Sequence, residues 1–131
     1  MEDEKREEVE HWLIKAEHDI RAANAVLKET PPITDVACFL AQQCVEKSFK
    51  GYLAFSDSHI EKIHDLNKLI GTCAHTDKTF LELIPLAKGM TAYAVKERYP
   101  DNWREIPYEE AVSAVRRAGK IMSFVKAKVG L

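Results

Sequence analysis

The chain has 131 residues, of which 46% are hydrophobic and 31% are charged, and its formal net charge is −2 at pH 7. This length predicts one domain, residues 1–131, with a core that needs no metal or disulfide, and the hydrophobic content excludes an intrinsically disordered chain. The small net charge argues against a nucleic-acid-binding surface that covers the whole molecule, so any basic surface must be local.

The chain has three cysteines and no long apolar segment. Cys38, Cys44 and Cys73 form no C-x-x-C pair, and their odd number argues against a disulfide framework, so we expect them to be reduced and buried. The acidic N-terminus and the lack of a run of about 18 apolar residues predict a protein that is neither exported nor membrane-spanning. Reduced cysteines favour a cytoplasmic location.

Two long amphipathic helices are predicted in the first half of the chain. The first spans about residues 4–28, where apolar residues recur at alternating spacings of four and three, and Pro31 and Pro32 end it. The second runs from Thr34 or Asp35, either of which can cap it, to about Phe55. Its apolar residues cover about half of the helix circumference, which suits packing against two neighbours. Its polar residues gather in an arc on the other side: Gln42, Gln43, Glu46, Lys47 and Lys50.

A short third helix is expected to start near His64 or Asp65 and to end at Gly71. A fourth helix is predicted over residues 77–99, where its first residue can cap it and Pro85 should kink it unless the helix starts there. Its inner stripe consists of Phe80, Ile84, Ala87, Thr91 and Ala94.

Pro107 fits the first position of a last helix. Its apolar stripe consists of Ala111, Val115, Ala118, Met122, Val125 and Val129. Since no segment alternates like a strand, we predict an all-α fold, an up-and-down four-helix bundle with an additional short helix. The expected core includes Leu13, Ile20, Leu40, Cys44, Val45, Ile84, Val115 and Met122.

Two Glu-x-x-His spacings are of the kind that binds iron in helical bundles. Glu8 and His11 lie off the apolar stripe of their helix and should face solvent, whereas Glu61 and His64 lie at a loop–helix junction without further core carboxylates. We therefore expect no metal and no cofactor. The chain also lacks the glycine-rich phosphate-binding motifs and the nucleophile elbow.

The polar residues have simple structural interpretations as well as functional ones. The arc of residues 42–50 is interpretable as a solvated helix face on which Glu46 and Lys50 form an i,i+4 pair. The segment 62–66 is interpretable as a helix start at which Asp65 accepts hydrogen bonds from free backbone N–H groups.

Arg98 follows Phe80 by 18 residues and projects onto the same inner stripe, where a charge is unfavourable unless it is paired. Three explanations stay open. The guanidinium forms an ion pair with Glu46 or Asp65, it extends to solvent from the helix end, or it contacts a bound anion such as a phosphate.

Four clusters in this order resemble the HEPN domain family of prokaryotes, and together they cover nearly the whole chain. They are Trp12-x-x-x-Ala16-x-x-Asp19-Ile20, Gln42-Gln43-x-x-Glu46-Lys47-x-x-Lys50, Lys62-x-His64-Asp65-Leu66 and Arg98-Tyr99-Pro100-Asp101. The resemblance implies a bundle of about five helices that is usually a homodimer. It also implies a possible partner, a minimal nucleotidyltransferase, in a toxin–antitoxin-like or nucleotide-handling module. Carried over by position, the residues implied to line a shared cleft for a nucleotide or anion are Gln43, Lys47, Lys50, His64, Arg98 and Tyr99.

The chain departs from the RNA-cleaving branch of that family, in which an arginine is followed four to six residues later by a histidine. No histidine follows Arg98, and the fifth residue after it is Trp103. We therefore expect no catalytic residue and favour a nucleotide- or partner-binding module. The alternatives are a metal-independent RNase toxin, in which His64 would supply acid–base chemistry, and a non-catalytic dimerisation bundle.

A homodimer is expected partly from the resemblance and partly from aromatic residues that lie off the main apolar stripes or in loops, where such side chains often anchor interfaces. These residues are Trp12, Tyr93, Tyr99 and Trp103. A two-fold contact along the second and fourth helices would place two copies of Arg98 and of the Lys47/Lys50 face around one cleft.

Overall fold

The computed structural model describes residues 1–95, 97 and 99–131, and the described residues form helices but no strands. Its longer helices are α1 (Asp3–Leu27), α2 (Thr34–Phe55), α3 (Leu66–Ala74) and α5 (Tyr108–Val129). Between α3 and α5 lie the short elements η1 (Lys78–Leu83), α4 (Ile84–Ala87), η2 (Met90–Ala94) and η4 (Pro100–Asn102). The predicted all-α fold is confirmed.

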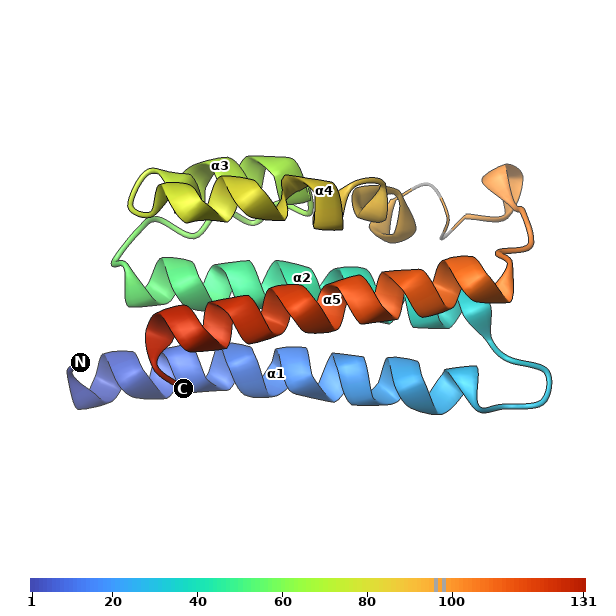
Figure 1. Cartoon of the computed structure of the whole chain (residues 1–131), viewed down its shortest axis with the longest axis horizontal. Helices are drawn as coiled ribbons and strands as arrows, with labels where there is room; N and C mark the ends of the chain where they lie inside the picture. The colour runs from blue at the N-terminus through green and yellow to red at the C-terminus, as the bar shows by residue number, and fades with distance from the viewer. Residues whose placement is uncertain (96, 98) are drawn as a thin grey trace.

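Helix α2 lies in the middle of the bundle (Figure 1). α1 runs antiparallel along one side of it, α5 packs against both, and α3 with the short elements that follow covers the opposite side (Figure 1). Both ends of the chain lie toward the same end of the bundle, whereas the α1–α2 turn and the start of α5 lie at the other. Because α1, α3, α5 and η2 all pack against α2, little of its circumference faces solvent.

The apolar stripe of α1 is buried along its whole length, as its spacing predicts. Its buried residues are Val9, Leu13, Ala16, Ile20, Ala23 and Leu27. α1 approaches α2 closely at Gly51, where an added Cβ would lie only 3.2 Å from the Cβ of Trp12. This close approach accounts for a glycine in the middle of a helix, where the residue type is otherwise unfavourable.

The predicted fourth helix over residues 77–99 is wrong as a continuous helix. Asp77 does act as a cap, because its side chain accepts a hydrogen bond from the backbone N–H of Thr79 at 3.0 Å. The chain then forms two 3₁₀ segments around the single turn α4, which has Pro85 near its start, and Gly89 adopts a positive φ of 80° that ends the turn. As a result Ile84, predicted to be in the core, is exposed.

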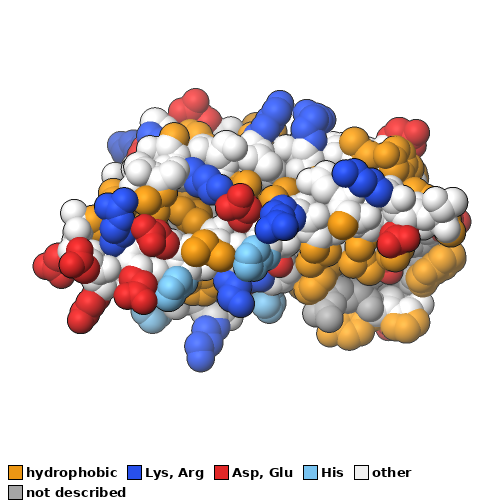
Figure 2. Space-filling view, turned by 90° about the horizontal axis from the view of Figure 1, so that it is seen from below, with side chains coloured by type: hydrophobic (Ala, Val, Ile, Leu, Met, Phe, Trp, Pro, Cys, Tyr) orange, Lys and Arg blue, Asp and Glu red, His pale blue; other side chains and the backbone are white. Residues whose placement is uncertain are grey.

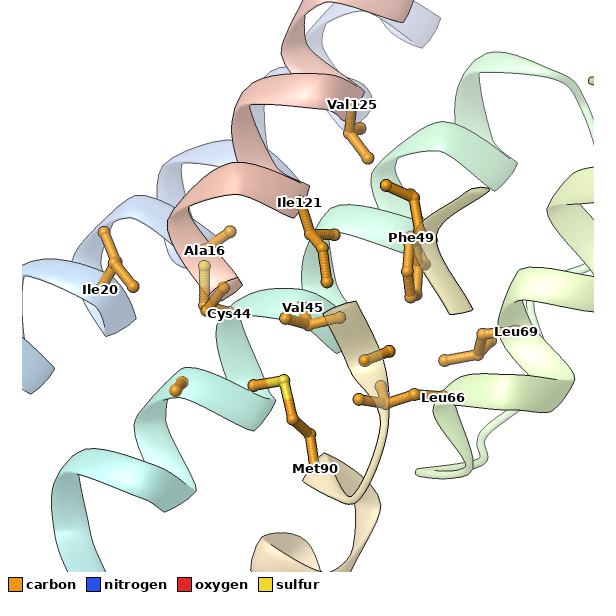
Figure 3. Packing of buried hydrophobic residues seen from close by; sticks show 14 of the residues in the cluster. Ala16, Ile20, Cys44, Val45, Phe49, Leu66, Leu69, Met90, Ile121 and Val125 are labelled. Carbon is orange, nitrogen blue, oxygen red and sulfur yellow. The ribbon is translucent and has the colours of Figure 1, made fainter. Parts of the chain in front are cut away.

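Side chains from α1, α2, α3, α5 and η2 point into one common interior (Figure 3). Phe80 of η1 is fully buried, and its ring centre lies 4.3 Å from that of Tyr52 and 5.2 Å from that of Phe124. Six predicted stripe residues of α5 are in or beside this core, although Met122, like Leu40 of α2, is only partly buried. α3 continues past Gly71 to Ala74, so the predicted stop at this glycine is wrong.

The three cysteines are free and buried, as expected. Burial raises the pKa of the Cys38 thiol to about 11 and the pKa values of Cys44 and Cys73 to about 12. Among the described helices, none combines the length and the apolarity needed to cross a bilayer.

Candidate functional site

Three polar residues of α2 are buried in a row along one face of the helix. Gln42, Glu46 and Lys50 follow one another at intervals of four residues, and Glu46 and Lys50 are only 5% and 7% exposed. The interpretation of the arc as a solvated helix face is therefore wrong. The expected Glu46–Lys50 pair does form, with Nζ donating to Oε2 at 3.0 Å, but it forms in the interior because α2 is covered by its neighbours.

His64, in the segment just before α3, completes this row from outside α2. Its ring Nδ1 lies 2.8 Å from Oε1 of Glu46, and its backbone carbonyl accepts a hydrogen bond from Nε2 of Gln42 at 3.3 Å. Nε2 of Gln42 also donates to Oε1 of Glu46 at 3.2 Å. The His64 side chain is nevertheless 60% exposed, so it joins a buried network to the surface.

The Glu46 carboxylate is the centre of this network. Burial alone would raise its pKa, but the hydrogen bonds that it accepts from His64 and Lys50 outweigh burial and hold the pKa below the ordinary value. The group is therefore ionised at neutral pH, and Lys50 supplies the opposite charge. Nζ of Lys50 also lies 6.0 Å from the centre of the Trp12 ring, which adds a cation–π contact with α1.

The residues expected to line one cleft fall into separate groups. Gln43, Lys50 and His64 belong to the network around Glu46, because Nε2 of Gln43 donates to Oε1 of Gln42 at 2.9 Å. Lys47 instead donates to Oδ2 of Asp19 on α1 at 2.7 Å.

The other two expected cleft residues follow η2. Tyr99 is exposed in the segment that leads to η4, toward the end of the bundle where α2 and α5 begin (Figure 1). Arg98 lies outside the described residues, so its predicted burial and pairing remain predictions.

Two residues that fix the site were missed by the sequence interpretation. Oγ1 of Thr91 on η2 accepts a hydrogen bond from the backbone N–H of Leu66 at 3.1 Å, which ties the His64 segment to a third element. Gln42 was assigned to the polar arc and to a motif of the family resemblance but not to the cleft, although its side chain donates hydrogen bonds to both Glu46 and the His64 carbonyl. Asp65 caps α3 as predicted, with Oδ1 accepting from the N–H groups of Asn67 and Lys68 at 3.0 and 3.2 Å. Within the described residues no three His, Cys, Asp or Glu side chains are grouped to hold a metal ion.

Arg104, in the segment between η2 and α5, links this segment to α5. Its guanidinium donates two hydrogen bonds to the Glu110 carboxylate, at 3.0 and 2.6 Å, and a third to Oε1 of Glu97 at 3.1 Å. The hydroxyl of Tyr93 donates to the same Glu110 carboxylate at 2.7 Å.

Tyr93 is buried, so it is not available for an interface, although its position in the sequence suggested that it would be. Trp103, next to Arg104, is 73% exposed.

Hydrophobic side chains gather at this end of the molecule, whereas acidic side chains gather at the opposite end (Figure 2). Six of these hydrophobic residues are exposed near the starts of α2 and α5 and in the segment between η2 and α5. We call them the end surface: Ile33, Val36, Val95, Tyr99, Trp103 and Tyr108. A hollow lined in part by Ile33, Trp103 and Ile106 lies within it.

Comparison with known proteins gives a consistent result. A family model described as HEPN domain matches residues 9–128. The crystal structure of TT1696 from Thermus thermophilus is 28% identical in sequence, with a TM-score of 0.79, over 92% of this chain and 97% of that one. The crystal structure of ST0689, described as an archaeal HEPN homologue, is also 28% identical, with a TM-score of 0.71 and the same coverage. No curated protein shows a significant match.

Proposed function

The chain belongs to the HEPN domain family, and from this premise we propose that it is a non-catalytic binding module for a nucleotide. We further propose that it pairs with a second copy of itself and with a minimal nucleotidyltransferase in a toxin–antitoxin-like system. The nucleotide site in this proposal is the surface around His64.

The observation that carries the nucleotide proposal is that His64 is exposed and yet fixed. Surface side chains ordinarily keep their rotamer freedom, but this ring is held by the buried Glu46 carboxylate at 2.8 Å. Groups that must meet a ligand in a defined geometry are supported in this way.

Positive charge near His64 supports the binding of an anionic ligand. Lys62 and Lys68 flank His64 in sequence and are exposed, and neither forms an ion pair with a described residue. Lys47 and Lys50, which the family resemblance assigns to the cleft, are already neutralised by Asp19 and Glu46. In this proposal the phosphate groups are therefore contacted by Lys62 and Lys68. They are also contacted by Arg98, whose forked donors suit phosphate.

Calorimetric titration with ATP tests this proposal. The double variant Lys62→Ala/Lys68→Ala should bind ATP about tenfold more weakly, since two exposed, solvent-screened charge contacts of roughly 0.7 kcal/mol each add up to about 1.4 kcal/mol. Lys28→Ala is the control, because Lys28 is also exposed but lies at the end of α1. No ATP binding by the natural protein, or equal effects of the two variants, would contradict the proposed site.

The proposed homodimer uses a different surface from the one expected from the sequence. A two-fold contact along α2 would need the Lys50 face to be open, but Lys50 is buried. The end surface offers exposed aromatic side chains instead, and Tyr99 and Trp103 are of the type that anchors interfaces.

Light scattering tests the homodimer. The chain mass is 14.9 kDa, so a dimer has twice that mass. Trp103→Ala should shift the population toward the single chain, whereas Ile14→Ala, at an exposed apolar residue of α1, should not. A single-chain mass for the natural protein at micromolar concentration would rule the homodimer out.

A further inference from the structure

The contact between Glu46 and His64 determines which ring nitrogen of His64 carries the proton. The Glu46 carboxylate is ionised at neutral pH, so its oxygens only accept hydrogen bonds. Since Nδ1 of His64 lies 2.8 Å from Oε1, this nitrogen must be the donor. In a neutral imidazole the other nitrogen, Nε2, is then an acceptor with a free lone pair.

Charge balance allows His64 to be neutral. A buried carboxylate needs a nearby positive charge, and Lys50 provides it, with Nζ 3.0 Å from Oε2. His64 is therefore not required as the counter-ion of Glu46. Its ring satisfies a remaining acceptor position of the carboxylate and in return takes a fixed orientation.

The backbone around His64 is held as firmly as the ring. Gln42 of α2 donates to the His64 carbonyl, and Leu66 donates to Thr91 of η2. Asp65 between them caps α3. His64 thus sits between three elements at the surface, and no described residue forms a hydrogen bond with its Nε2.

We propose that Nε2 of His64 accepts a hydrogen bond from a ribose hydroxyl group of the bound nucleotide, so that His64 selects ribonucleotides over sugars that lack hydroxyls. This inference rests on the proposed nucleotide binding and adds the part of the ligand that is recognised. An acceptor needs a donor, and phosphate groups at neutral pH are mostly deprotonated and act mainly as acceptors. Ribose hydroxyls are the donors that every ribonucleotide has, whichever base it carries.

The tautomer can be tested without any ligand. Nitrogen-15 NMR of the histidine rings at about pH 8, where imidazoles are mainly neutral, should show His64 with the proton on Nδ1. The four other histidines, His11, His18, His59 and His75, provide internal references. A proton on Nε2 of His64 would overturn the inference whether or not a nucleotide binds.

The ribose contact is tested by titrating ATP and 2′,3′-dideoxy-ATP into the full chain. The natural protein should prefer ATP by roughly two- to tenfold, the contribution of one hydrogen bond between neutral groups. His64→Asn is the decisive variant, because the asparagine amide can replace Nδ1 as the donor to Glu46 but has no group at the position of Nε2. It should keep the unfolding midpoint of the natural protein and bind both nucleotides equally.

The outcomes separate this inference from the proposed function. Binding of ATP without preference over the dideoxy nucleotide would overturn the ribose contact alone. An unchanged preference in His64→Asn would also overturn it, as would an equal loss of affinity for both nucleotides, which would assign His64 to a phosphate. Failure of the natural protein to bind either nucleotide would overturn the proposed function together with the ribose contact.

Discussion

Replacing Glu46 with leucine should lower the free energy of unfolding by about 3–5 kcal/mol, because it leaves the Lys50 ammonium buried without its counter-charge. The two side chains are each more than nine-tenths buried, and their charged atoms are 3.0 Å apart. The substitution also removes the acceptor for Gln42 and for the His64 ring. Little solvent is available to compensate for these losses.

A surface ion pair of similar length provides the matched control. Nζ of Lys5 lies 2.8 Å from Oδ2 of Asp57, but the Asp57 side chain is 77% exposed. Asp57→Asn should cost less than about 1 kcal/mol, since exposed ion pairs contribute little. Asparagine is the appropriate replacement because Asp57 has a positive φ of 56°, which asparagine tolerates. Burial is then the main difference between the two pairs.

Urea unfolding followed by circular dichroism measures these differences. The double variant Glu46→Leu/Lys50→Met should be more stable than Glu46→Leu alone, because no unpaired charge remains in the interior. The reasoning is refuted if Glu46→Leu lowers the free energy of unfolding by no more than Asp57→Asn does. It is also refuted if the double variant loses as much stability as Glu46→Leu and Lys50→Met, each measured alone, lose together.

Other predictions concern the core, acid stability, Arg98 and catalysis. Phe80→Ala should cost about 3–5 kcal/mol in the same urea assay, since the ring is fully buried among aromatic neighbours. The folded-state pKa of Glu46 lies below the ordinary value of 4.5, so its stabilisation is complete above about pH 4.5 and is lost as the pH falls through the folded-state pKa. Glu46→Gln should therefore lose less stability than the natural protein between neutral pH and pH 3, and an equal loss would show that Glu46 is not involved. Arg98→Ala should weaken ATP binding more than Lys28→Ala in calorimetric titration, and equal effects would make Arg98 an ordinary surface residue. The purified protein should not cleave tRNA or mRNA, because the arginine-to-histidine spacing of the nuclease branch is absent; cleavage that disappears in His64→Ala would contradict this.

The long helices were predictable because each carries an apolar stripe over many turns. α2 begins and ends at Thr34 and Phe55 as predicted, and α1 differs from its prediction by one residue at each end. The region after α3 was not predictable in the same way. Its apolar residues keep a helical spacing, but Pro85 and Gly89 interrupt the backbone and shift every later residue to a new direction.

The candidate site was predictable in its members but not in its environment. Projection of α2 onto a helical wheel places Gln42, Glu46 and Lys50 on one side, which is correct, but it does not say what covers that side. The cover comes from α1 and from the His64 segment, which contacts α2 only through tertiary packing. Long-range contacts of this kind have no signature in local periodicity. The family resemblance includes both His64 and Glu46 in its motifs, but it does not indicate that the two side chains are partners.

The burial of all three thiols makes the natural chain suitable for site-specific labelling. With pKa values raised to about 11 for Cys38 and about 12 for Cys44 and Cys73, the thiolates that react with maleimides are scarce at neutral pH. A cysteine introduced at an exposed position such as Lys28 should therefore react far faster than the native three. Spin labels or fluorophores attached there would report the distance between the two chains of the proposed homodimer without prior removal of the native cysteines.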